Sequence, residues 1–225
     1  MTGTVIYTDF DGVINAFPDE KVLRRGGQTR LGWLKDDDPR KALYDSGHAF
    51  LLDRGKRVDL GSRGRFRIRW SGELAANLAD LSARDGVELD WLSTWQPYTM
   101  LLDSALDWDP ALVSTVRWYD PVTGEGRLTG KRRAVYRRVD VEARSESPMA
   151  VVWIDDEECH YQRKIELESL QPAAPVLMVR PDDRIGISRR QWRLIADFTA
   201  DPSAFGMVTL DEEPSVHQRS GHISL

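Results

Sequence analysis

The stretch TVIYTDFDGV, residues 4–13, decides the fold. Its first five residues are β-branched or aromatic, which is typical of a buried strand. We expect this strand to end at Asp9, and Asp11 and Gly12 follow at once. In open α/β sheets the ligand lies beyond the carboxyl ends of the strands. The two aspartates therefore mark the first edge of an expected site.

Four more core strands are expected downstream, separated by helical patterns. The strands are expected at residues 87–93, 112–119, 149–154 and 175–179. The helices are expected from Ser71 to about residue 85, at 98–106, at 131–139, from beyond Asp156 to about Leu170, and after Ser188. This alternation predicts an α/β domain with a three-layer, Rossmann-like and mostly parallel sheet, covered by helices on both faces.

Residues 16–64 interrupt the alternation. They contain a glycine pair at 26–27, an acidic run at 36–38 and Pro39, and they show no long periodic helix. We interpret them as a cap-like insertion of loops and short elements after the first strand. Such an insertion would start beside the expected site.

A basic strand is expected at the end of the insertion. Arginines at positions 63, 65, 67 and 69 alternate with Gly64, Phe66, Ile68 and Trp70. A period of two predicts a half-buried strand, here with a basic outer face. Such a face is more often solvated than bound to nucleic acid, and both interpretations stay open.

The end of the chain has a different composition. From Asp201 onward it is polar and contains Pro, Gly and Ser. We expect residues 1–200 to form the catalytic domain and residues 201–225 a flexible C-terminal tail.

Composition narrows the class of protein. The chain has 225 residues, 41% of them hydrophobic and 30% charged, and a net charge of −5, which argues against a general nucleic-acid coat but allows local basic patches. Cys159 has no second cysteine to pair with, which fits a reducing compartment. No apolar run approaches the length of a membrane span and no leader pattern is seen. We expect a cytoplasmic protein with no membrane partner; no pattern predicts its oligomeric state.

Polar residues follow three of the expected strands. They are Asp9 with Asp11, Ser93 with Thr94, and Asp155 with Asp156, while Lys131 precedes the basic helix. A carboxylate can attack phosphorus to form an acyl-phosphate, and a second carboxylate can transfer protons. A hydroxyl and a lysine can hold phosphoryl oxygens, and further carboxylates can bind Mg²⁺, which prefers oxygen ligands. The set predicts magnesium-dependent phosphoryl transfer.

These motifs resemble the four motifs of the haloacid-dehalogenase-like (HAD) superfamily, in the same order. The matching elements are DFDGV after the first strand, Ser93-Thr94, Lys131 and the Asp155-Asp156 pair, so the resemblance covers roughly residues 1–15 and 66–200. The segment VLMVRPDDRIGISRRQWRLIADF, residues 176–198, is more weakly similar to the end of phage and actinobacterial domains linked with RNA-repair proteins.

The resemblance implies a role for each matching residue. Asp9 would be the nucleophile and a metal ligand, and Asp11 the general acid/base with its backbone carbonyl on the metal. Ser93 or Thr94 would bind the phosphoryl group. Lys131 would be the third-motif cation, with Arg132 and Arg133 as rivals. Asp155 would bind Mg²⁺, and Asp156 would bind it directly or through water.

Three functions follow from these expectations. The leading one is a HAD-like phosphatase that hydrolyses a phosphorylated small molecule through an aspartyl-phosphate. The second is a phosphatase for nucleotides or nucleic-acid ends, favoured by the arginines and by Trp95, although core packing is the better interpretation of Trp95. The third is a non-catalytic binding module. Plainer roles also stay open: Ser93 and Thr94 can satisfy backbone groups, Lys131 can be a solvated charge, and His48 is more often structural than functional.

Overall fold

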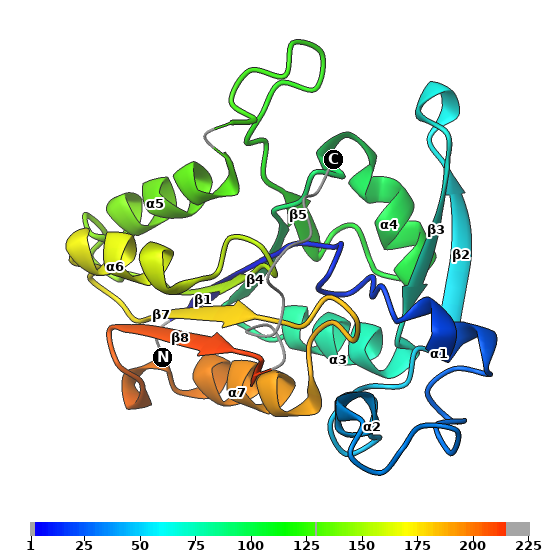
Figure 1. Ribbon diagram of the computed structural model, residues 1–225. Coiled ribbons are helices and arrows are strands. Elements are labelled where there is room, and N and C mark those ends of the chain that lie inside the picture. The colour runs from blue at the N-terminus through cyan, green and yellow to red at the C-terminus, as the bar shows by residue number, and fades with distance from the viewer. Residues whose placement is uncertain (1–2, 129, 215–225) are drawn as a thin grey trace.

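Strand β1 (Thr4–Thr8) lies in the middle of a six-stranded sheet. The computed structural model describes residues 3–128 and 130–214 (Figure 1). The strand order is β5-β4-β1-β6-β7-β8, and every neighbouring pair is parallel. The other strands are β4 (Val87–Trp91), β5 (Val113–Thr115), β6 (Ala150–Ile154), β7 (Val176–Arg180) and β8 (Val208–Glu212). The expected α/β fold with a parallel sheet is confirmed.

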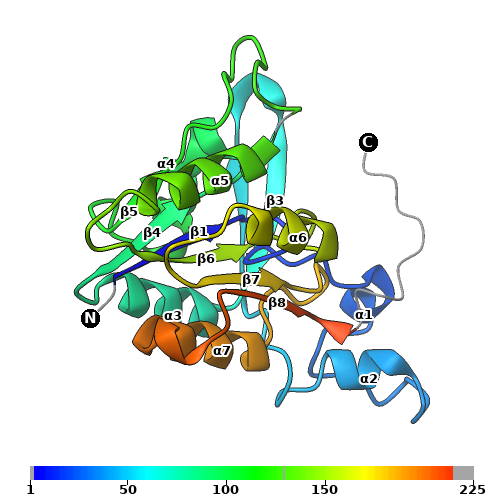
Figure 2. The ribbon, with the colours of Figure 1, turned by 90° about the vertical axis from the view of Figure 1, so that its left-hand side faces the viewer.

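Helices cover both faces of the sheet. Figures 1 and 2 show α3 (Gly72–Ser82) and α7 (Arg189–Ala200) on one face, and α5 (Gly130–Glu142) and α6 (Tyr161–Ser169) on the other. Helix α4 (Thr99–Leu106) and the 3-10 turn η2 (Gln96–Tyr98) join β4 to β5. All five of these helices are predicted from the sequence.

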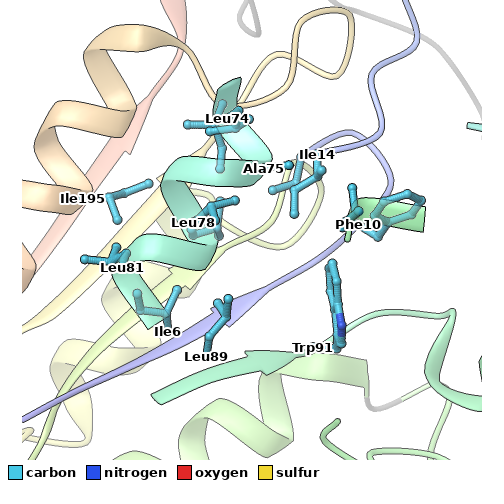
Figure 3. Packing of buried hydrophobic residues seen from close by; sticks show 14 of the residues in the cluster. Ile6, Phe10, Ile14, Leu74, Ala75, Leu78, Leu81, Leu89, Trp91 and Ile195 are labelled. Atoms are coloured by element: carbon cyan, nitrogen blue, oxygen red, sulfur yellow. The ribbon is translucent and has the colours of Figure 1, made fainter. Parts of the chain in front are cut away.

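The residues of β1 alternate between the two layers. Ile6 packs with Leu78 of α3 in one hydrophobic cluster, whereas Val5 and Tyr7 pack with Val135 of α5 in another. Figure 3 shows the first cluster, in which Ile6 lies among side chains of β4, α3 and α7. A fully buried Leu or Ile contributes about 1.5–3 kcal/mol relative to exposure. This burial holds β1, and the aspartates after it, rigidly in place.

The end of the insertion and the basic strand after it form a β-hairpin. Strand β2 (Arg54–Asp59) pairs antiparallel with β3 (Arg65–Trp70), and the 3-10 turn η1 (Gly61–Arg63) joins them. The hairpin is a separate sheet that rises beside the carboxyl ends of the main strands (Figure 1). The basic strand expected at 63–70 is confirmed from Arg65 onward, but its partner β2 was not foreseen. Only one residue of β2 is buried, so the strand has no apolar alternation for sequence reasoning to detect.

The rest of the insertion is short elements, as expected. Helices α1 (Glu20–Arg24) and α2 (Pro39–Leu43) have five residues each. Asp38 caps α2 by accepting the N–H of Arg40 over 3.0 Å. Residues of this region, among them Val22, Leu43 and Tyr44, form a small hydrophobic cluster with Ile185 from the loop after β7.

Two expectations need correction. The strand expected at 112–119 is only three residues long, since the N–H groups of Trp118 and Tyr119 bind the Gln96 side chain instead of a neighbouring strand. The flexible tail expected from Asp201 is wrong for residues 201–214, which contain the 3-10 turn η3 (Pro202–Ala204) and β8. Pairing with β7 supplies the order that composition did not predict. Residues 215–225 lie outside the described part of the chain.

Within the described residues, no helix is long and apolar enough to cross a membrane.

Candidate active site

The carboxyl ends of β1 and β6 bring three charged side chains together. Nζ of Lys131, in the first turn of α5, donates to Oδ2 of Asp9 and to Oδ2 of Asp155, the latter over 2.8 Å. All three side chains are buried. The N–H of Asp9 binds the carbonyl of Ile154 over 2.9 Å, so the two strand ends are joined by the backbone as well.

The remaining oxygens of these carboxylates are held by backbone donors. Oδ1 of Asp9 accepts the N–H of Phe10 over 2.7 Å. Oδ1 of Asp155 accepts the N–H groups of Glu157 and Glu158 over 3.0 and 2.8 Å. The turn that ends β6 thereby fixes the direction of Asp155 and leaves its second oxygen facing Lys131.

Asp156 completes an acidic cluster. Asp9, Asp155 and Asp156 each offer a carboxylate oxygen, and these oxygens lie within 4.8 Å of one another. Gly12 makes room for this approach, because a Cβ on Gly12 would overlap the Asp156 carboxylate. Gly12 also has φ of +71°, a conformation that glycine adopts without strain. Three converging carboxylates suit a hard divalent cation such as Mg²⁺.

The pKa shifts of these side chains also favour a bound cation. Burial raises the pKa of Asp9 to about 6, against the opposing effect of Lys131. Burial, with Asp155 and Asp9 nearby, raises the pKa of Asp156 to about 9. Burial acts to lower the pKa of Lys131, but Asp155 and Asp9 outweigh it and raise that pKa. One amine thus faces three carboxyl groups, an excess of negative charge that a bound cation would offset.

Asp11 is held at both oxygens. Asn15 Nδ2 donates to Oδ1 over 2.6 Å, and Trp95 Nε1 donates to Oδ2 over 2.9 Å. Trp95 is buried, and its ring meets Phe10 and Phe66 edge-on. This carboxylate is partly exposed and rigidly oriented, as a group that exchanges protons with a substrate requires.

Ser93 and Thr94 follow β4 in different environments. Ser93 is 1% exposed; its hydroxyl accepts the N–H of Trp95 over 3.3 Å and acts to lower the pKa of Asp9. Thr94 is exposed at the same edge. The carbonyls of both residues accept ring donors, from Trp118 over 3.1 Å and from Tyr119 over 3.0 Å, so the segment is fixed from behind.

No protein-family model matches the chain, and no curated protein matches it. One solved structure resembles it. That structure is the HAD domain of the effector protein Lem4 from Legionella pneumophila, at 14% sequence identity and a TM-score of 0.44, covering 90% of this chain and 96% of that one. A likeness at this level says nothing about chemistry, so residue roles rest on the site itself.

The structure brings the residues singled out in the sequence to one edge of the sheet. Lys131 contacts two of the aspartates, whereas its rival Arg133 is exposed. Trp95 packs in the main hydrophobic cluster, which confirms the prediction of core packing. His48 lies elsewhere, in an ion pair with Glu213 over 3.2 Å.

Sequence reasoning missed the residues that position Asp11 and Asp156. The sequence predicted no positioning role for Asn15 or for the indole N–H of Trp95. It gave Gly12 only as part of the motif. The spacing of Asn15, four residues after Asp11, was a usable signal. The partnership of Trp95 with Asp11 spans 84 positions and left no local signal.

Proposed function

We propose that this chain is a magnesium-dependent phosphatase that hydrolyses a phosphomonoester through an aspartyl-phosphate on Asp9. The observation that supports this most is the position of the Asp9 carboxylate, which contacts Lys131 and belongs to the acidic cluster. Asp11 lies two residues further along the chain and is held at both oxygens.

In the first step a carboxylate oxygen of Asp9 attacks phosphorus, and the bond from phosphorus to the ester oxygen breaks. Asp11 gives its proton to the leaving oxygen, which departs as an alcohol. Thr94, exposed at the same edge, and Lys131 supply donors for the phosphoryl oxygens.

In the second step Asp11, now ionised, takes a proton from water. The water oxygen attacks phosphorus, the acyl-phosphate bond breaks, and inorganic phosphate leaves with Asp9 restored. The hydrogen bonds from Asn15 and Trp95 keep Asp11 in one orientation through both steps. Asp9, Asp155 and Asp156 would hold Mg²⁺, which would offset charge between the carboxylates and the phosphoryl group.

The test is hydrolysis of an aryl phosphate with magnesium present. Asp9→Asn should abolish turnover while the protein stays folded, because an amide does not form the acyl-phosphate. Asp85→Asn is the matched control, since Asp85 is exposed in the turn before β4, at the opposite edge of the sheet, and should keep wild-type activity.

Turnover by Asp9→Asn equal to that of the control would refute the mechanism. A wild-type protein that binds magnesium but hydrolyses no phosphomonoester, across nucleotides, sugar phosphates and aryl phosphates, would favour the non-catalytic binding module.

A further inference from the structure

The β2–β3 hairpin has a basic face. In the register of the two strands Arg57 lies directly opposite Arg67, and Arg69 lies opposite Gly55. Residues two apart on a strand share a face, so these three arginines, here called the basic face, stand on one side of the hairpin. They line a hollow of about 480 Å³ together with Arg54 and Lys56, and with Asp53, which pairs with Arg54 over 3.7 Å.

The basic face is not neutralised by the protein. Arg65, next along β3, is paired with Asp59 over 2.9 Å. In residues 3–128 and 130–214 no carboxylate lies within ion-pair distance of an arginine of the basic face. Like charges directly opposite on paired strands are destabilising. Burial and the charge of Arg67 also lower the pKa of Arg69. The arrangement is one that an external anion would stabilise.

The basic face is joined to the active-site loop. The N–H of Arg69 donates to Asn15 Oδ1 over 2.8 Å, and the N–H of Ala16 donates to the carbonyl of Arg69 over 3.0 Å. Asn15 in turn donates to Asp11. One edge of β3 pairs with β2, and the other edge is thus bound to the loop that follows Asp9. The backbone of Arg69 therefore ties the basic face to the loop that carries Asp11, while the arginine side chains stand on the face of β3 that is turned away from Trp95.

The opposite face of β3 offers an aromatic surface. Phe66 is 44% exposed, and its ring meets Trp95 edge-on with 5.8 Å between centroids. Trp95 is the residue that donates to Asp11. Proteins bind single-stranded nucleic acids with exposed rings, on which bases stack, and with cations that follow the phosphates. The hairpin offers both, the ring on the face turned to Trp95 and the arginines on the other face.

We propose that the hairpin binds the backbone of a single-stranded nucleic acid, so that the substrate is a strand with a terminal phosphate. This rests on the proposed phosphatase for the chemistry at Asp9. Arg67 and Arg69 are spaced roughly 6.6 Å apart along β3, which suits a row of phosphates better than one phosphate group. The exposed ring of Phe66, which meets the indole that donates to Asp11, favours a base over a lipid headgroup or an acidic peptide.

The net charge of −5 restricts where a polyanion can bind this protein. A chain with excess negative charge does not attract a polyanion as a whole, so binding must depend on a local basic surface. Loss of that surface should then remove binding, whereas loss of other arginines should not.

Binding is tested without turnover, in the Asp9→Asn protein, by fluorescence anisotropy of a labelled, phosphate-ended single strand of about 12 nucleotides. Adding Arg57→Gln and Arg67→Gln should raise Kd about tenfold or more. The slope of log Kd against log salt should fall by about 1.4, for two lost phosphate contacts. Adding Arg84→Gln and Arg193→Gln instead is the control, because it removes the same charge from exposed positions after α3 and on α7.

The melting temperature of each variant checks that it is folded. No binding of the strand at low salt overturns the proposal, and so does an equal loss of affinity in the control. Binding of vesicles rich in anionic lipid, without binding of the strand, also overturns it. Strand binding by a protein that hydrolyses no aryl phosphate would support the hairpin site while refuting the phosphatase, so the two proposals fail separately.

Discussion

At the scale of single residues, the loop after β1 concentrates the chemistry. Asp9 contacts Lys131, Asp11 is held by Asn15 and Trp95, and Gly12 lies against Asp156. The positioning contacts come from other segments as well as from the loop, so each can be removed separately from the reacting groups.

Trp95→Phe should reduce kcat about tenfold and leave KM nearly unchanged. The change removes the indole N–H from Asp11 and keeps a buried aromatic ring, so proton transfer is affected more than binding. The loss should be larger for an alkyl phosphate than for an aryl phosphate, since the alkyl leaving group depends more on protonation.

Trp108→Phe is the control for this prediction. Trp108 lies in the same hydrophobic cluster as Trp95. Its replacement also removes a buried indole hydrogen bond, which Trp108 donates to the carbonyl of Ala75. If both variants lose the same activity on both leaving groups, the effect comes from core packing and the positioning role of Trp95 is wrong.

Gly12→Ala should raise the magnesium concentration needed for half-maximal activity about tenfold or more. The new methyl group would displace the Asp156 carboxylate, and the positive φ adds a backbone cost of about 1–2 kcal/mol. Gly27→Ala isolates that backbone cost, because Gly27 has φ of +78° and no atom within 4 Å of an added Cβ. A magnesium requirement raised equally by both changes would contradict the prediction.

At the scale of elements, β8 links the end of the described chain to the insertion. Glu213, directly after β8, is 2% exposed and pairs with His48 of the insertion. The hydrogen bond to Glu213 raises the pKa of His48, against the opposing effect of burial. Burial acts to raise the pKa of Glu213, but hydrogen bonds from His48 and Ser188 outweigh it and lower that pKa.

The sign of the pH dependence follows from these shifts. His48 has a higher pKa folded than unfolded, so its stabilisation is complete below about pH 6.5 and is lost as pH rises through the folded pKa. Glu213 has a lower pKa folded, so its contribution is lost only when pH falls below about 4.5. The pair is therefore most stabilising near pH 6.

His48→Gln should reduce the free energy of unfolding by a few tenths to about 1 kcal/mol at pH 6, and by less at pH 9. Denaturant unfolding at the two values measures this. His160→Gln is the contrasting control, because burial lowers the pKa of His160 and its effect should not decline with rising pH. An equal effect of His48→Gln at both values would contradict the pairing.

At the scale of the whole molecule, a cation would join segments far apart in the chain. Asp9 follows β1, whereas Asp155 and Asp156 follow β6. A ligand that binds the folded chain alone stabilises it by mass action, by about 2.7 kcal/mol at a hundredfold excess over Kd. Magnesium should therefore raise the melting temperature as well as support activity.

Asp156→Asn should reduce that magnesium-dependent rise in melting temperature, and Asp85→Asn should not. Calcium should stabilise the fold but inhibit hydrolysis, because its longer bonds and higher coordination number misalign Asp9 and phosphorus. Full activity in the presence of a chelator would refute the metal requirement.

Local patterns determined most of the fold. A run of β-branched and aromatic residues predicted β1, an apolar run predicted β6, and helical spacing predicted α3 and α7, because burial of one face or both leaves its period in the sequence. The aspartates were placed in the site for the same reason: they end strands that are parallel, and parallel strands end at one edge.

Tertiary structure alone decided the rest. Lys131 meets Asp9 across 122 positions, and Trp95 meets Asp11 across 84, contacts that depend on how helices and turns pack over the strands. The polar strand β2 is ordered by pairing with β3, which composition does not reveal. Strand β8 pairs with β7 and packs Val208 and Leu210 into the second hydrophobic cluster, too short an apolar pattern to stand out in a polar segment. A strand that is stabilised mainly by backbone hydrogen bonds to its neighbour needs no apolar pattern of its own. Such a strand cannot be predicted from its own residues.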